Sequence, residues 1–421
     1  MILHERFSDR QRLWLVATLF LVSMLSYADR NVLSVVIEGI KRDFALSDTM
    51  VGLLIGAPFS ILFALSGIFV ARLADLHSRK VVLIVCLLVW SVATILCGIS
   101  GGVWMLVIAR MLVGVGEAGT APASHSLAAD YCPPEQRSRA YAALTASAAV
   151  GGFVALTAGG LVAGRYGWRA AFLGMALLSL PVLVLACLVL VEPRAATIVR
   201  RGEHPAKTDL LRQVRALAAK RSYVLIVFGV TLYGFVAYGP LLLAPAYMIR
   251  VLRVDVAQVG LTFGPALGAG TLIGSLLGGL LGDRLSRRDA RWLVRLPGLG
   301  LLASTPIGLL AFRANDSATF IVACTLLVGV LSACLPILFA ALQAVCGPGR
   351  RALATALLFG SLNMIAMTFG PLLTGSLSDI FSQTQGVQGF RSALLASIWL
   401  LIPAGLIVIA AGRWLIDEVE S

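Results

Sequence analysis

Two matching segments decide the fold class of this sequence: DLHSRK at residues 75–80 and DRLSRR at residues 283–288. Each lies between two long apolar runs and therefore forms a short charged turn. In each half of the chain, the turn comes directly after the second apolar run. The sequence thus predicts two parallel repeats of one helical unit.

The composition requires lipid as the solvent for most of the chain. Of the 421 residues, 59% are hydrophobic and only 13% are charged, whereas a soluble domain carries about 25% charged residues. A membrane-spanning helix needs about 20 apolar residues. We expect twelve such spans, at residues 13–38, 50–74, 80–100, 103–129, 138–164, 168–191, 223–249, 256–282, 292–312, 317–343, 352–378 and 389–415.

A polar, basic segment divides the twelve spans into two sets of six. It contains two prolines and one short helical pattern at residues 208–220. We expect one bundle at residues 1–191, a cytoplasmic linker at residues 192–221 and a second bundle at residues 222–421. The predicted fold class is an all-α membrane protein with twelve transmembrane helices, in two six-helix bundles related by pseudo-two-fold symmetry.

Lysine and arginine residues predict the orientation in the membrane. The net charge of +13 would suggest nucleic-acid binding in a soluble protein. Here the positive residues collect in loops, where they set orientation. With the N-terminus in the cytoplasm, about 24 of them lie on the cytoplasmic side and about 8 on the other. We therefore expect both termini in the cytoplasm and no nucleic-acid partner.

Glycine marks the expected close contacts between spans. The fifth span carries Gly159 and Gly160, and the eighth carries Gly270, Gly274 and Gly278 at four-residue spacing. Small residues let helix backbones approach closely in lipid. We expect these glycines to serve packing, with the fifth and eighth spans meeting between the two bundles.

Four charged residues lie within the predicted spans. Asp29 and Arg30 belong to the first span, and Arg110 and Glu117 belong to the fourth. Charges at this depth are costly and usually mark an ion or substrate path. A rise of 1.5 Å per residue places the two pairs at overlapping depths. One arrangement consistent with this has Arg30 beside Glu117 and Asp29 near Arg110.

These charges suggest proton coupling through Asp29 and Glu117. Burial favours the protonated form of a carboxyl group, and a nearby guanidinium favours the ionised form. Movement of an arginine would therefore switch protonation. A static ion pair that only positions the helices is the alternative. Arg110 could equally bind an anionic substrate group, because a guanidinium stays charged and forks onto carboxylate or phosphate.

The second half offers polar but uncharged residues in its spans. The cavity candidates are Tyr27 in the first span and Thr231, Tyr233, Tyr238 and Asn363 in the second half. A cavity that is charged on one wall and apolar on the other suits an amphipathic substrate. A polar sugar would require amide and indole contacts on both walls.

Several motifs resemble the Spinster-like branch of the major facilitator superfamily. They are YADR at residues 27–30, RMLVGVGEA at residues 110–118, ADY at residues 129–131 followed by Pro134, Arg137 and Arg139, and GWR at residues 167–169. The resemblance covers nearly the whole first half and, more loosely, the second, and the short loops resemble a bacterial member. It implies proton-linked transport of lipid-like molecules, with the intramembrane acid–base residues at Asp29, Arg30 and Glu117.

The same resemblance implies a cytoplasmic gate in the first charged turn. The gating motif of the superfamily falls on Asp75, Arg79 and Lys80, where it would hold the ends of the second and eleventh spans together. This sequence departs from the motif, because Ala71 replaces its leading glycine, and Leu76 and Ser78 replace an arginine and a glycine.

We therefore expect a monomeric secondary transporter in a bacterial inner membrane, working by alternating access among membrane lipids. It would couple protons to an amphipathic, lipid-like or lysolipid substrate; the alternative is a proton-linked carrier of organic anions or sugar acids. We expect no cofactor and no metal, because the seven cysteines and four histidines are scattered. A membrane enzyme is disfavoured, since the sequence offers no metal triad and no nucleophile elbow. A receptor or scaffold is disfavoured, because it gives no reason for the charges within the spans.

Overall fold

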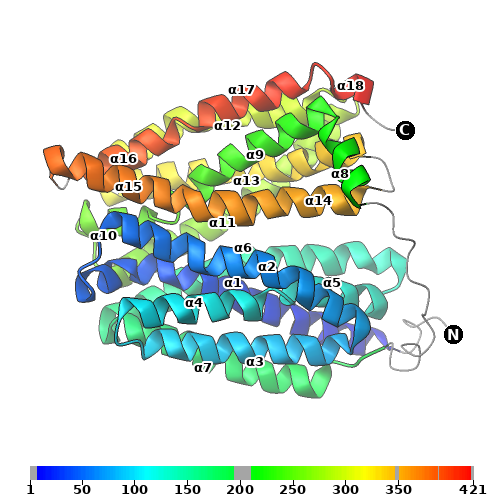
Figure 1. The fold of residues 1–421 in the computed structure, drawn as a ribbon, viewed down its shortest axis with the longest axis horizontal. Helices are drawn as coiled ribbons and strands as arrows, with labels where there is room; N and C mark the ends of the chain where they lie inside the picture. The colour runs from blue at the N-terminus through cyan, green and yellow to red at the C-terminus, as the bar shows by residue number, and fades with distance from the viewer. Residues whose placement is uncertain (1–6, 194–209, 347–349, 387, 419–421) are drawn as a thin grey trace. The chain divides into compact units, whose positions relative to one another are not determined.

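A computed structural model describes residues 7–193, 210–346, 350–386 and 388–418 of the chain (Figure 1). Regular structure in these ranges is helical throughout, without a strand. Twelve helical segments are long and apolar enough to cross a membrane, which confirms the predicted number of spans. The cysteines are all free thiols.

The helices fall into two compact units, which are described separately. The first unit comprises residues 1–46, 58–203 and 255–265, and the second comprises residues 47–57, 204–254 and 266–421. Two helices therefore pass from one unit into the other. α2 (Asp48–Leu76) leaves the second unit at Pro58, and α11 (Val256–Ser286) leaves the first unit directly after Pro265.

The first unit is built around α1, which packs along α6 and also contacts α7 and α5. A capping box at Ser8 and Gln11 starts α1, and α6 begins at a proline that directly follows its N-cap. Gly167 separates α6 from α7 with a φ of +85°, a conformation that favours glycine. The bounds are α1 (Asp9–Asp43), α3 (Arg79–Gly98), α4 (Val103–Glu117), α5 (Thr120–Tyr131), α6 (Pro134–Tyr166) and α7 (Trp168–Val189).

The second unit packs α9 against α17 and α15, and α12 against α13 and α17. The bounds are α8 (Leu210–Ala218), α9 (Arg221–Tyr238), α10 (Ala244–Arg250), α12 (Trp292–Arg313), α13 (Ser317–Cys346), α14 (Arg351–Gly360), η3 (Ser361–Ala366), α15 (Met367–Gln385), α16 (Gln388–Ile398), α17 (Leu401–Ala411) and α18 (Leu415–Glu418). α8 lies within the short helical pattern expected in the linker at residues 208–220.

Three predicted spans are interrupted where the sequence analysis expected continuous helices. The span predicted at residues 223–249 is wrong as one helix, because α9 ends before Gly239–Pro240 and α10 begins at Ala244. Proline lacks the N–H that would continue the helix. The twelfth span breaks between α16 and α17, three residues before Pro403, and the fourth is divided between α4 and α5 at Gly119.

The eleventh span contains an unexpected π-helical segment, η3, between α14 and α15. A π segment inserts an extra residue into the helix and occurs frequently at functional sites. Asn363, one of the predicted cavity residues, lies within it. Its side-chain amide donates to the carbonyl of Phe359 at 2.9 Å.

The glycines of the fifth and eighth spans do serve packing, but against different partners. In the first unit, a Cβ built on Gly160 would lie 2.9 Å from Cα of Gly260, so α6 lies against the first turns of α11. The stripe at Gly270, Gly274 and Gly278 instead faces α13; a Cβ on Gly274 would lie 2.1 Å from the carbonyl oxygen of Gly329. The four-residue stripe thus belongs to the interior of the second unit.

Candidate functional site

The two charged spans meet in the interior of the first unit. Arg30 on α1 directs Nη2 to within 2.8 Å of Glu117 Oε2 on α4. The hydroxyl of Ser26, one turn before Arg30, donates to the same oxygen at 2.9 Å. The side chain of Glu117 is fully buried, whereas that of Arg30 is 17% exposed. The pair considered in the sequence analysis is therefore present, with Ser26 as an additional partner.

Asp29 occupies a separate polar contact on α1. It is 4% exposed, and its Oδ2 lies 2.7 Å from the hydroxyl of Thr94 on α3. The same hydroxyl lies 2.9 Å from the carbonyl oxygen of Trp90. A hydroxyl has one proton but can also accept. Thr94 can therefore donate to an ionised Asp29, or accept from a protonated Asp29 while it donates to the backbone.

Arg110 is a buried cation without a hydrogen bond among the described residues. It is 1% exposed, and none of its three guanidinium nitrogens has a partner there. Its guanidinium lies 5.3 Å from the ring centre of Phe59, a cation–π contact. Buried polar groups are normally hydrogen-bonded, so this guanidinium marks a place for a ligand, a water molecule or a moving carboxylate.

Aromatic rings surround the guanidinium of Arg30. Its central carbon lies 4.6 Å from the ring centre of Phe59, 5.0 Å from that of Phe63 and 5.3 Å from that of Tyr27. Phe59 thus contacts both buried cations. Rings stabilise a cation without supplying a fixed hydrogen-bond geometry. This surface therefore allows Arg30 to change partners at a lower cost than a fully hydrogen-bonded site would.

Two glycines of the RMLVGVGEA motif bring these groups together. A Cβ on Gly114 would lie 2.5 Å from the carbonyl oxygen of Phe59, so α4 and α2 are in close contact there. A Cβ on Gly116 would lie 2.6 Å from the backbone nitrogen of Trp90, so α4 is equally close to α3. The motif therefore combines the charged residues with the helix contacts that position their partners.

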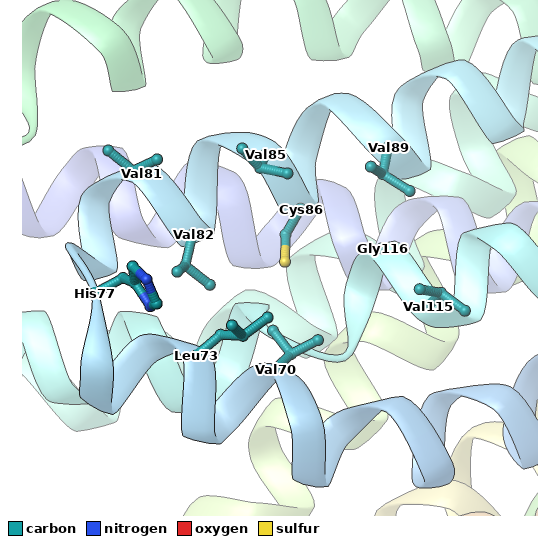
Figure 2. Close-up of a pocket in the computed structure, with 10 residues that line it drawn as sticks. All are labelled: Val70, Leu73, His77, Val81, Val82, Val85, Cys86, Val89, Val115 and Gly116. Carbon is teal, nitrogen blue, oxygen red and sulfur yellow. The ribbon is translucent and has the colours of Figure 1, made fainter.

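A groove is formed by residues of α2, α3 and α4 (Figure 2). It has a volume of about 290 Å³ and includes Gly116, the residue before Glu117. Most of its lining is valine, and His77 lies at one end (Figure 2). In the part of the chain that the structure describes, the lining includes no Asp, Glu, Lys or Arg, so the groove suits an acyl chain rather than a charged ligand.

Of the five cavity candidates, Tyr27 lies in the first unit and the other four lie in the second unit. Thr231 bonds within its own helix, to the carbonyl of Val227 at 2.8 Å. Tyr233 is buried in α9, and Tyr238 is the last residue of that helix. The hydrogen bond of Thr231 therefore stays within α9 and does not reach a charged side chain. Their role in a cavity stays a prediction.

The first charged turn forms a buried network inside the first unit. Arg79 is 1% exposed and binds Asp130 at 2.7 Å and Glu192 at 2.6 Å. Lys80 donates to the carbonyl of Cys187 at 2.8 Å. Glu192, which the sequence analysis placed at the start of the linker, is thus part of the bundle. The side chain of Asp75 lies outside the described residues, and the gate stays a prediction.

The sequence analysis missed a polar cluster at the first turn of α2, in the second unit. Asp48 binds Arg250 at 2.8 Å and accepts from the hydroxyl of Ser378 at 2.5 Å. Asp379 accepts from the backbone N–H groups of Asp48 and Thr49 at 2.9 and 2.8 Å. These residues lie at the ends of spans, where charges are ordinary in a sequence.

Comparison with known proteins identifies the class. Residues 19–298 match the Major Facilitator Superfamily, and the chain belongs to that family of transporters. It is 34% identical to an MFS-type efflux pump of Mycolicibacterium smegmatis, across 99% of this chain and 96% of that protein. It is 28% identical to Protein spinster homolog 1 of Xenopus tropicalis, across 88% of this chain and 74% of that protein.

A solved structure assigns the branch. The chain superposes with a TM-score of 0.89 on a bacterial homologue of the human lysosomal transporter Spinster, in an inward-facing and unoccupied conformation; the two are 26% identical and cover 99% and 100% of each other. The protein is a Spinster-like transporter of small molecules with twelve spans. The resemblance and fold predicted from the sequence are confirmed, and the membrane-enzyme alternative is excluded.

Proposed function

We propose that this protein couples proton movement to transport of an amphipathic, lipid-like substrate. The observation that carries the proposal is the state of Glu117, which is fully buried and shares one oxygen between Arg30 and Ser26. Its other oxygen, Oε1, has no hydrogen-bond partner among the described residues. If Arg30 leaves, a buried carboxylate loses its counter-charge and takes a proton.

Asp29 is the second proton carrier in this proposal. Its contact with Thr94 accommodates both protonation states, since the hydroxyl can donate or accept. Burial removes water that would otherwise exchange protons freely with both carboxyl groups. Arg30 is the more exposed member of its ion pair, so it is the group that moves between partners.

The substrate is proposed from the uneven distribution of charge. Arg110, without a hydrogen bond among the described residues, supplies a site for an anionic headgroup. The cavity candidates Tyr233, Tyr238 and Asn363 belong to a set of spans with apolar interiors, which suits a hydrocarbon tail. The same unpartnered guanidinium also favours the second candidate, a proton-linked carrier of organic anions or sugar acids.

The larger cycle is alternating access in a bacterial inner membrane, with both termini in the cytoplasm and the protein acting as a monomer. Bundles at residues 1–191 and 222–421 open in turn to the two sides. They are joined by the linker at residues 192–221, of which Glu192 packs against the first bundle. Asp75, Arg79 and Lys80 form the cytoplasmic gate. The excess of positive residues in the loops on that side supports this orientation.

Ligand-dependent stabilisation tests the substrate before any transport assay. Ligands that bind the folded protein raise its melting temperature by mass action. We expect lysolipids or sphingoid phosphates to stabilise the purified wild type, and expect Arg30→Ala and Arg110→Gln to reduce this effect. Thr271→Val is the matched control, because this hydroxyl donates to the carbonyl of Leu267 in its own helix and Thr271 is not a cavity candidate. Stabilisation by small carboxylates alone would overturn the lipid proposal and leave the organic-anion carrier.

Proton coupling is tested separately with the substrate found in this way. In proteoliposomes, Glu117→Gln should retain exchange of labelled substrate between the two sides but lose accumulation driven by a proton gradient. Exchange does not require net proton movement, so it reports whether the variant still folds and binds. Unchanged gradient-driven accumulation in Glu117→Gln and in Asp29→Asn would overturn the coupling assignment.

A further inference from the structure

A basic pocket in the second unit lies far along the chain from the charged spans. It has a volume of about 570 Å³ and is formed by the first turns of α12 and the end of α17. Its lining combines three arginines with an apolar floor: Arg291, Arg295, Arg413, Leu406, Ile409, Ala410 and Gly412. The pocket therefore offers both cationic and hydrocarbon contacts within one cavity.

The three guanidinium groups are poorly neutralised by the protein. Arg295 has one carboxylate near it, Asp289, at 3.8 Å, and both side chains are partly exposed. In the parts of the chain that the structure describes, the side chains of Arg291 and Arg413 make no hydrogen bond or ion pair. Glu418, a nearby acid in sequence, is engaged with the backbone of Arg221 and Ser222. A net positive charge is therefore left at the pocket.

The position of two arginines increases this charge. Arg291 is the N-cap of α12, and Arg295 lies one turn later on the same face. The N-terminus of a helix carries a partial positive charge and favours anions. Arginines at this end are intrinsically unfavourable, so the arrangement is best stabilised by an anion that binds both the arginines and the helix end. A topology signal alone would not require the arginines to converge on a cavity.

The helices that form the pocket approach most closely one turn deeper. A Cβ on Gly405 would lie 2.7 Å from the carbonyl oxygen of Gly298, so α17 and α12 are in close contact there. Beyond this contact the arginine side chains line the opening. Leu406 is 54% exposed within a membrane-spanning helix, so its outer face meets lipid tails. Trp292 and Trp414 lie at the same ends of the spans, as is typical of the membrane interface.

We propose that this pocket binds the headgroup of an anionic phospholipid of the surrounding membrane. The arginines bind the phosphate diester through charge-assisted, forked hydrogen bonds. The glycerol lies over Ala410 and Ile409, and an acyl chain follows the exposed face at Leu406. Basic pockets between spanning helices are a known setting for such headgroups. None of its lining residues is among those proposed for substrate or proton binding, so the proposal does not depend on the coupling.

Melting temperatures in defined mixed micelles test the proposal. With phosphatidylglycerol, compared with phosphatidylcholine, the wild type should gain about 3–6 °C. The variant with Arg291→Gln, Arg295→Gln and Arg413→Gln should lose this gain. Arg284→Gln, Arg287→Gln and Arg288→Gln together remove the same charge from exposed arginines at the end of α11, and this control should retain it. Arg413→Gln alone, which alters no helix interior, should lose part of the gain.

Three results would overturn the site. The first is an undiminished preference for phosphatidylglycerol in the pocket variants, with Arg413→Gln as the reference should the triple variant fail to fold. The second is an equal loss in the α11 control, since the effect would then depend on total charge. The third is equal stabilisation by soluble glycerol phosphate, because the apolar floor would then have no role.

Discussion

In the residues that the structure describes, the spans of the first unit carry charges in their interior, whereas those of the second unit carry charges only towards their ends. Asp29, Arg110 and Glu117 are buried within the spans of the first unit, away from the span ends. The buried acid of the second unit, Asp48, lies at the first turn of a helix, paired with Arg250. The two repeats therefore share one architecture but differ in the charged residues of their interiors. One unit holds the carboxyl groups proposed to exchange a proton, and the interior of the other is mainly apolar.

The variant with the largest expected effect neutralises the two buried carboxyl groups of the first unit. Asp29→Asn combined with Glu117→Gln should reduce gradient-driven transport by at least about 100-fold, because the removed groups are proposed to carry the proton. The measurement is substrate accumulation in proteoliposomes with an imposed pH gradient. Thr271→Val in the second unit, whose hydroxyl donates within its own helix, should leave accumulation near the wild-type level. An equal loss in both variants would mean that the two units share the coupling.

The repeated turns provide the next comparison, because the same arginine has a different environment in each. Arg79 is buried between Asp130 and Glu192, while its counterpart Arg287 is exposed. Removing one partner of a buried ion pair leaves uncompensated charge. Arg79→Gln should lower the free energy of unfolding by about 3 kcal/mol, measured by thermal melting in detergent. Arg287→Gln should change it by less than about 0.5 kcal/mol.

Glycine packing in the second unit can be tested within one helix. Gly274→Ala should destabilise by about 1–3 kcal/mol, because its Cβ would meet the backbone of Gly329. Gly279→Ala introduces the same atom where nothing lies within 4 Å, and it should leave the melting temperature unchanged or slightly higher. Equal melting temperatures for the two variants would contradict the close contact between α11 and α13.

The smallest expected effect belongs to the hydroxyl beside Asp29. Thr94→Val keeps the shape of the side chain and removes its bond to Asp29, and gradient-driven transport should fall by about tenfold. Thr94→Ser restores the hydroxyl and should recover most of the rate. The same loss in Thr94→Ser would show that packing, rather than the hydrogen bond, is responsible.

The architecture could be predicted because its signals are local and strong. Twelve apolar runs and the repeated turns require no knowledge of tertiary contacts, and charged residues within spans are rare enough to be conspicuous. Thr94 and Ser26 could not be found in this way, because hydroxyl residues are common in spans and usually bond to their own helix, as Thr231 does. Whether a hydroxyl faces a carboxylate depends on helix rotation and packing.

Other features depended on contacts between distant parts of the chain. Asp48 and Asp379 are 331 residues apart, and neither residue is unusual at a span end. Glu192 follows the last apolar residue of its span and therefore resembled the start of a linker. The π-helical segment η3 has no local signal, because one extra residue in a helix leaves composition and hydropathy unchanged.

The two helices that pass between the units each contain a proline at the crossing, Pro58 in α2 and Pro265 in α11. A proline removes one hydrogen bond from the helix and lowers its resistance to bending at that position. If one unit rotates relative to the other, α2 and α11 can bend at these two prolines. The bends then lie at the positions where each helix passes from one unit to the other. Replacing both prolines with alanine would stiffen α2 and α11 without changing any charged residue.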